Sequence, residues 1–170
     1  AAFEVIVNKV LPKLFDNGQK EIRIWSAGCS TGEEVYSLAM VIRSYLDDNR
    51  ISKEVKIFAT DIDRRSLEYA GQGLYPESIV SDVDPKLLAR YFVRKENGYQ
   101  IGESIRKMAI FASHNVLKDP PFSKLDLIVC RNLFIYFKPD SQLYVLNLFR
   151  LALKPGGFLF MGSSETLGVY

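Results

Sequence analysis

One stretch of sequence decides the fold, Ile22-Arg23-Ile24-Trp25-Ser26-Ala27-Gly28-Cys29-Ser30-Thr31-Gly32-Glu33-Glu34. It joins a buried strand, a turn of small residues and the acidic start of a helix, which is the layout of a nucleotide-binding crevice. Gly28 and Gly32 allow positive φ angles or a close approach of the backbone to a ligand. Ala27 and the small residues beside it keep the wall of the turn thin. The stretch therefore predicts a ligand crevice at the carboxyl end of this strand.

The charges at the start of the helix indicate which ligand fits. A pyrophosphate is bound by free N–H groups at a positive helix end, whereas this helix opens with Glu33 and Glu34. At about 4 Å and an effective dielectric constant near 20, one like-charge contact costs on the order of 4 kcal/mol. The expected ligand is therefore cationic, and a sulfonium with an α-ammonium group fits. A capping box from Ser30 to Glu33 or from Thr31 to Glu34 would need the same residues and no ligand.

Composition and charge limit the class of protein. The 170 residues are 48% hydrophobic and 12% aromatic, which fits a single domain with a substantial core. The net charge of +2 and the scattered Lys and Arg residues give no sign of a nucleic-acid partner. Cys29 and Cys130 form no CxxC pair, so we expect a reduced, cytoplasmic setting. No stretch approaches the roughly 20 apolar residues of a membrane span, so direct membrane insertion is not expected.

Strand and helix patterns alternate along the chain. Strands are predicted at 22–25, 55–60, 110–112, 125–130 and 158–162, and helices at 3–15, from 35 to 46, near 64, at 85–91 and from Asp140 or Ser141 to 153. Pro12 is expected to kink the first helix. Asn97-Gly98 is a hairpin signal in the irregular stretch 73–108. The last strand, after the short turn 154–157, is expected to add antiparallel or at an edge. The pattern predicts an α/β fold, a mostly parallel sheet with helices on both faces.

Polar residues follow four of the predicted strands. They are Ser26-Ala27-Gly28, Asp61-Ile62, Asn115-Val116 and Arg131-Asn132. Ligands of open α/β sheets bind at the carboxyl ends of the strands, so these residues are expected to surround one ligand.

The residues at these strand ends suit an adenosine. The two oxygens of Asp61 match the spacing of vicinal ribose hydroxyls. Ile62 can cover one face of an adenine, and Asn115 with the backbone of Val116 can read its edge. Two alternatives stay open, because Asp61 could cap the helix near Arg64 and Asn115 could stabilise its own turn.

The segment Arg131-Asn132-Leu133-Phe134-Ile135-Tyr136-Phe137 places a guanidinium, an amide and a phenol in an apolar setting. The planar fork of Arg131 can pair with a carboxylate at two points, and Tyr136 can donate a hydrogen bond or shape the channel to the reacting atom. As alternatives, Tyr136 could be a core ring and Arg131 could pair with Glu165.

The residues favour a reaction that needs no base. His114 is the single histidine, and no spaced His/Cys cluster is present, so neither a Ser–His–acid set nor a metal site is expected. Methyl transfer from a sulfonium to a carboxylate fits, because a glutamate with an ordinary pKa of about 4.3 is ionised at neutral pH. A water-poor pocket that aligns carboxylate, methyl carbon and sulfur supplies rate through proximity and altered solvation.

Four ordered blocks of the sequence resemble the CheR-type chemotaxis receptor methyltransferases. They run from Trp25 to Ser37, Phe58 to Asp63, Cys130 to Phe137 and Leu153 to Gly157. The resemblance covers nearly all of residues 1–170 and implies the C-terminal S-adenosylmethionine (SAM) binding domain of a protein-glutamate O-methyltransferase, with a Rossmann-like class I methyltransferase fold. It implies methylation of glutamate side chains on cytoplasmic helices of chemoreceptors, with S-adenosylhomocysteine as the product.

The same resemblance implies roles for single residues. Tyr136 and Arg131 become the predicted catalytic residues, with Tyr136 near the transferred methyl group. The predicted cofactor contacts, to which the turn itself adds Gly28 and Glu33, are Ala27, Gly28, Glu33, Glu34, Asp61, Ile62, Asn115, Val116, Arg131 and Asn132.

Two departures from the family affect what is expected. A small β-subdomain is implied near residues 91–111, but its Lys95-Glu96-Asn97-Gly98 loop is short, which suggests a member that does not bind a receptor tail peptide. The family's N-terminal helical domain and a Thr-x-x-Phe-Phe-Arg stretch are expected to be absent. The chain could then bind the cofactor and be catalytically weak.

Three alternatives to a chemoreceptor methyltransferase remain. The first is a methyltransferase domain of a larger sensor with another acidic protein target. The second is a non-catalytic or partner-dependent SAM-binding module of such a sensor. The third, a dinucleotide oxidoreductase, is opposed by Glu33 and Glu34 and by the glycine spacing.

Overall fold

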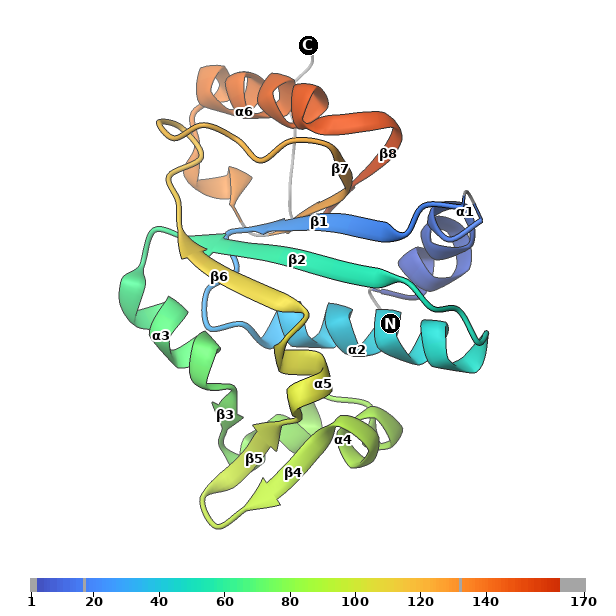
Figure 1. Cartoon of the computed structure of the whole chain (residues 1–170). Coiled ribbons are helices and arrows are strands. Elements are labelled where there is room, and N and C mark those ends of the chain that lie inside the picture. Colours follow the sequence, from blue (N-terminus) through green and yellow to red (C-terminus); the bar gives the residue numbers. More distant parts are fainter. Residues whose placement is uncertain (1–2, 17, 132, 163–170) are drawn as a thin grey trace.

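The computed structural model describes residues 3–16, 18–131 and 133–162. Its main sheet has the strand order β6-β2-β1-β7-β8, and every neighbouring pair is parallel. The strands are β1 (Glu21–Ala27), β2 (Glu54–Asp61), β6 (Ala109–Ser113), β7 (Leu125–Cys130) and β8 (Leu153–Met161). The predicted parallel α/β sheet is thus confirmed, and β1 lies at its centre (Figure 1).

Helices cover both faces of this sheet. Figure 1 shows α2 (Glu33–Asp48) on one face and α6 (Pro139–Ala152) on the other. Ile24 of β1 belongs to the apolar cluster that includes α2, whereas the next residue, Trp25, belongs to the cluster that includes α6. Successive strand residues point to opposite faces, so a strand buried on both sides is apolar without interruption. The predicted sheet-facing stripe of α2 is fully buried and consists of Val35, Leu38, Ala39, Ile42 and Leu46.

The remaining helices are short. Near the N-terminus, the π-helix η1 (Ile6–Val10) leads into α1 (Leu11–Leu14), and the wide turn ends with the Leu11 N–H bonded to the Ile6 carbonyl. Pro12 then stands in the first turn of α1, where its missing N–H costs little, so the predicted distortion precedes the proline. The others are α3 (Arg64–Gln72), η2 (Glu77–Ser81), α4 (Pro85–Tyr91), α5 (Glu103–Arg106) and η3 (Phe134–Tyr136).

A second, antiparallel sheet is inserted between α3 and β6. Its strand order is β3-β5-β4, with β3 (Leu74–Tyr75), β4 (Phe92–Lys95) and β5 (Gly98–Ile101). The hairpin signal at Asn97-Gly98 corresponds to the β4–β5 hairpin, in which Gly98 already pairs with Lys95. The strands of this small sheet span residues 74 to 101, whereas Ala109 begins a strand of the main sheet.

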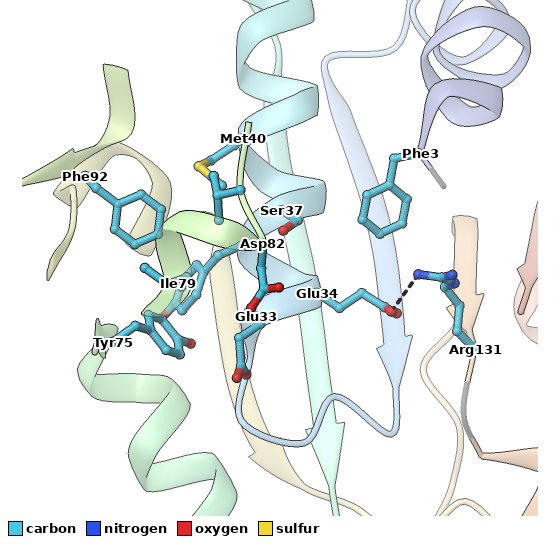
Figure 2. Close-up of a pocket in the computed structure, with 12 residues that line it drawn as sticks. Phe3, Glu33, Glu34, Ser37, Met40, Tyr75, Ile79, Asp82, Phe92 and Arg131 are labelled. Carbon is cyan, nitrogen blue, oxygen red and sulfur yellow. Dashed lines mark hydrogen bonds and ion pairs between the residues drawn. The ribbon is translucent and has the colours of Figure 1, made fainter. Parts of the chain in front are cut away.

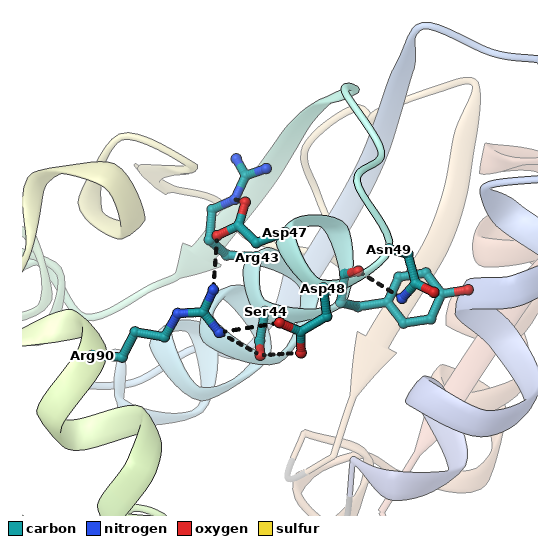
Figure 3. A network of polar contacts seen from close by, with 7 residues as sticks. Arg43, Ser44, Asp47, Asp48, Asn49 and Arg90 are labelled. Atoms are coloured by element: carbon teal, nitrogen blue, oxygen red, sulfur yellow. Dashed lines mark hydrogen bonds and ion pairs between the residues drawn. The ribbon is translucent and has the colours of Figure 1, made fainter.

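Exposed ion pairs attach α4, next to the small sheet, to the far end of α2. Nη atoms of Arg90 lie 3.5 Å from Asp47, 3.5 Å from Asp48 and 3.3 Å from the Ser44 hydroxyl (Figure 3). This network holds the insertion against the C-terminal turns of α2.

For the last elements, the predicted helix cap and the antiparallel alternative for the last strand are wrong, whereas its predicted place at an edge is confirmed. The cap of α6 is neither Asp140 nor Ser141: the helix starts at Pro139 after Lys138, without a side-chain cap, because proline suits the first helical position. The last strand is at an edge but runs parallel to β7, since α6 is the crossover that returns the chain. The predicted turn 154–157 forms an irregularity within β8, between the partners of Leu125 and Leu127. In the described part of the chain, no helix is long and apolar enough to cross a membrane.

Candidate functional site

The conformation of the turn after β1 is fixed by its backbone. Gly28 and Gly32 have φ angles of 76° and 91°, as expected from their predicted role, and Ser30 also has a positive φ of 51°. The backbone N–H groups of Gly28 and Cys29 both donate to the carbonyl of Thr60, at 2.9 and 2.8 Å. The turn is therefore fixed to the end of β2, the neighbouring strand.

Asp61 organises the turn from the end of β2. Its Oδ2 accepts a hydrogen bond from the Ser30 N–H at 2.8 Å, and its Oδ1 accepts one from the Asp63 N–H at 3.0 Å. The alternative in which Asp61 caps α3 is wrong, because Asp63 is the N-cap and accepts from the N–H groups of Arg65 and Ser66. A carboxylate oxygen has more than one lone pair, so Asp61 can still accept hydrogen bonds from a ligand.

The first turn of α2 carries its two glutamates without a capping box. The N-cap is Gly32, and no side chain caps the helix, so the capping-box alternative is wrong. The Thr31 hydroxyl instead donates to a carboxylate oxygen of Glu33. Both glutamates line the site rather than closing the end of the helix.

Glu34 pairs with Arg131 across the sheet edge. The Arg131 Nη1 donates to Glu34 Oε2 at 3.0 Å, from a residue 97 positions away (Figure 2). The guanidinium also lies 5.6 Å from the centre of the Phe3 ring and 5.8 Å from that of Phe160. Burial raises the pKa of Glu34, and the positive charge of Arg131 opposes that rise. Glu165, the other predicted partner of Arg131, lies outside the described residues.

Two adjoining cavities lie at the carboxyl ends of the strands. The larger has a volume of about 700 Å³ and is lined by Gly28, Cys29, Ser30, Thr31, Glu33, Glu34, Asp61, Ile62, Leu133, Ile135 and Tyr136. The smaller has about 160 Å³ and is lined by Ala27, Gly28, Thr60, Asp61, Ile62, His114, Asn115, Val116, Leu117, Leu133 and Phe137. Because Gly28, Asp61, Ile62 and Leu133 line both, one ligand could occupy both cavities. The volume of the larger cavity is that of a small-molecule site, and the smaller cavity extends it.

The structure brings most of the predicted site residues together. Eight of the cofactor candidates line one or both cavities: Ala27, Gly28, Glu33, Glu34, Asp61, Ile62, Asn115 and Val116. Arg131 lines an adjacent cavity of about 270 Å³, which it shares with Glu33 and Glu34 (Figure 2). Asn132 lies outside the described residues.

Two exposed side chains stand at the rim of the larger cavity. Tyr136 is 77% exposed, so the alternative that it is a core ring is wrong, and Ile62 is 71% exposed. Side chains with such a large exposed apolar surface are available to cover a ligand. Asn115 does act as a turn residue, since its Oδ1 accepts from the Leu117 N–H at 2.9 Å, yet it also borders the smaller cavity.

Several lining residues were not predicted. Leu133 borders both cavities and lies so close to Gly28 that a Cβ added there would be 3.4 Å from its own Cβ. Phe137 and His114 border the smaller cavity, and the His114 ring is bonded through Nε2 to the Pro120 carbonyl. Polar side chains after the strands were the basis of the predicted site, and Leu133 and Phe137 are apolar. Their place in the same segment as Arg131 was the signal available for them.

The charge of the larger cavity suits a cationic ligand. Three carboxylates, of Glu33, Glu34 and Asp61, line it, and none of its described lining residues is basic. Such a lining repels phosphates and attracts a sulfonium or an ammonium group.

A protein-family model, described as the SAM-binding domain of CheR methyltransferase, matches residues 1–169. The chain belongs to this family. SAM is thus the cofactor of the CheR domain, as predicted, and the acidic lining of the larger cavity fits its sulfonium and ammonium groups.

Relatives of this CheR domain include proteins named chemotaxis protein methyltransferases. The chain is 40% identical to the "Chemotaxis protein methyltransferase" of Borreliella burgdorferi and 38% identical to "Chemotaxis protein methyltransferase 1" of Pseudomonas aeruginosa. Each match covers 97% of this chain but only 61% and 62% of those proteins. The chain is also 39% identical to a 104.1 kDa protein of Rhodobacter capsulatus, over 98% of this chain and 18% of that protein.

Solved structures resemble the CheR domain in fold. The apo crystal structure of the SAM-dependent methyltransferase SibL matches with a TM-score of 0.55 and 13% identity, over 92% of this chain and 33% of SibL. At this identity the likeness concerns the fold alone, and it confirms the predicted class I methyltransferase architecture.

Proposed function

We propose that this chain transfers a methyl group from SAM to glutamate side chains of chemoreceptors, forming glutamyl methyl esters and S-adenosylhomocysteine in the cytoplasm. The observation that carries the proposal is the pair of joined cavities, one acidic and one largely apolar, at the strand ends of a CheR domain. We further propose that residues 1–170 act as one methyltransferase domain and that the acceptor glutamates lie on cytoplasmic receptor helices.

The residues divide into roles along the two cavities. Asp61, at their junction, would accept hydrogen bonds from the ribose hydroxyls, and Asn115 and Val116 would face the adenine in the smaller cavity. The carboxylate of Glu33 would face the α-ammonium group in the larger one. Ile62, at the rim, would cover the ligand and exclude water from it.

The proposed chemistry needs positioning rather than a base. When bound, SAM would supply an electrophilic methyl group on a sulfonium, and an acceptor glutamate, ionised at neutral pH, would need no base to remove a proton. Tyr136 stands at the open rim of the larger cavity, where an acceptor side chain would enter. Arg131, held between Glu34 and the rings of Phe3 and Phe160, would keep the adjoining wall in place. Alignment in a dry site is the main contribution of the protein.

Calorimetry with SAM, S-adenosylhomocysteine and NAD tests the cofactor assignment. We expect both sulfur compounds to bind and NAD not to bind. Asp61→Ala should weaken binding of S-adenosylhomocysteine at least about tenfold, because a hydrogen bond to a charged group is worth about 1.5–3 kcal/mol.

Asp63→Ala is the matched control. It removes a carboxylate two residues away that caps α3 and lines neither cavity, so it should lower stability through loss of the cap and leave binding unchanged. Tight NAD binding, or equal binding losses in the two variants, would refute the assignment.

Transfer of labelled methyl groups tests the acceptor. Receptor cytoplasmic fragments should gain base-labile methyl esters, and fragments with Gln at the acceptor positions should gain none. Tyr136→Phe should separate a role for the hydroxyl from a role for the ring, since only the ring is retained. Methyl transfer to an unrelated acidic protein but not to receptor fragments would contradict the chemoreceptor assignment.

A second candidate is a SAM-binding module of a larger sensor, without activity of its own. The observation that favours it is the 104.1 kDa relative, in which the matched region is 18% of the protein. Cofactor binding in calorimetry without any labelled methyl transfer would support this candidate.

A further inference from the structure

One buried tyrosine connects the small inserted sheet with the cofactor turn. The hydroxyl of Tyr75, on β3, donates a hydrogen bond to the backbone carbonyl of Thr31 at 2.7 Å, across 44 positions of sequence. Tyr75 is only 2% exposed. Thr31 lines the larger cavity, so this bond reaches the wall of the cofactor site from outside it.

The turn is also packed tightly against the phenol. A Cβ added at Gly32 would lie 3.0 Å from the Tyr75 hydroxyl oxygen and 2.7 Å from the Cβ of Ala70. Figure 2 shows Tyr75 beside the first turn of α2, close to Glu33. The turn thus has little freedom to shift toward α3 or the small sheet while Tyr75 keeps its place.

The small sheet in turn fixes Tyr75. Its backbone pairs with Tyr99 of β5, and a Cβ added at Gly98 in the hairpin would lie 2.0 Å from the Tyr75 carbonyl oxygen. The ring packs against Tyr36 and Tyr69, with centroid distances of 6.0 and 5.6 Å. Burial raises the pKa of Tyr75, so the phenol remains a hydrogen-bond donor.

We propose that Tyr75 is a positioning residue that holds the cofactor turn in its binding conformation, so that the small sheet sets the affinity of the cofactor site. The inference rests on the proposed function only for the identity of the ligand. Without the bond to Thr31, the turn would populate other conformations, and the apparent Kd would rise by the inverse of the fraction that remains competent.

Two matched tyrosine variants test the proposal. Tyr75→Phe removes the bond to Thr31, and Tyr36→Phe removes a bond of 2.6 Å to the carbonyl of Ala70, from a side chain as buried as Tyr75 and in the same aromatic group. We expect similar losses of thermal stability. Only Tyr75→Phe should raise the Kd of S-adenosylhomocysteine and the KM of SAM, by about 3- to 10-fold, with kcat nearly unchanged. Only this variant should show faster hydrogen exchange of the amides of residues 28–34.

Each other outcome overturns the proposal. Unchanged affinity and exchange in Tyr75→Phe would do so, and so would equal losses of affinity in both variants. A Tyr75→Phe protein that does not fold would also count against it, because the hydroxyl would then serve the whole core. If the wild-type protein binds no S-adenosylhomocysteine, the proposed function fails, whereas the exchange comparison still decides the role of Tyr75.

Discussion

The two ends of α2 are attached to the inserted region by different means. At the first turn, one hydrogen bond from the buried Tyr75 and a close fit around Gly32 hold the cofactor turn. At the last turns, Arg90 makes three longer polar contacts, of 3.3 to 3.5 Å, among exposed side chains (Figure 3). Exposed ion pairs contribute little, because solvent screens them and the side chains lose entropy. We therefore expect the buried attachment at the first turn to affect the cofactor site more than the exposed contacts at the last turns, although the exposed contacts are more numerous.

Gly32→Ala is expected to have the largest effect. The substitution combines a positive φ of 91° with a Cβ that would lie 2.7 Å from the Cβ of Ala70. Backbone strain of about 1–2 kcal/mol and overpacking of about 1–3 kcal/mol should lower the free energy of unfolding by about 2–5 kcal/mol. Urea denaturation measures this loss.

Gly156→Ala provides the control for backbone strain alone. Gly156 has a similar φ of 81°, but no atom lies within 4 Å of an added Cβ. This substitution should lower the free energy of unfolding by only about 1–2 kcal/mol. Equal losses of unfolding free energy in Gly32→Ala and Gly156→Ala would mean that the packing around the cofactor turn is loose.

Glu34→Gln should change how stability depends on pH. The folded-state pKa of Glu34 is raised by burial, so the folded protein holds this proton more tightly than the unfolded chain does. Its contribution to stability is present below the ordinary pKa of a glutamate and is lost as pH rises through the raised pKa. The stability of wild type relative to Glu34→Gln should therefore fall from acidic toward neutral pH.

Urea denaturation of both proteins across this pH range measures the difference. Glu96→Gln, at an exposed position of the hairpin, controls for the loss of one carboxylate. A constant difference between wild type and Glu34→Gln would show that the pairing with Arg131 cancels the effect of burial.

Arg90→Ala should have the smallest effect. It removes all three polar contacts at the far end of α2, yet the free energy of unfolding should change by no more than about 1 kcal/mol. Binding of S-adenosylhomocysteine should stay at the wild-type level. A loss of stability larger than that of Tyr75→Phe would reverse the ranking of the two ends.

Local patterns in the sequence predicted the elements that form the cofactor site. The stripe of α2, the bounds of α4 and the positive φ angles of Gly28 and Gly32 all followed from periodicity and residue type. The rule that ligands bind at the carboxyl ends of parallel strands placed Asp61 and Asn115 beside the same cavity.

Contacts between distant parts of the chain could not be predicted in this way. The partner of Glu34 is 97 positions away, and a periodic pattern contains no information about such a pair. Tyr75 belongs to a strand of two residues, which is too short to show an alternation. The direction of β8 depended on recognising α6 as a crossover rather than on the turn next to the strand.

The central position of β1 has a consequence for how the protein folds. One neighbour, β2, follows soon along the chain, but the other is β7, and the Arg23 N–H reaches the buried carboxylate of Asp126 across 103 residues. Pairings of such high sequence separation form slowly, since a long loop must close first. The cofactor pocket should thus be completed late in folding, after most of the domain has left the ribosome. In stopped-flow refolding with S-adenosylhomocysteine present, ligand binding should appear in the slowest phase and not in the early ones.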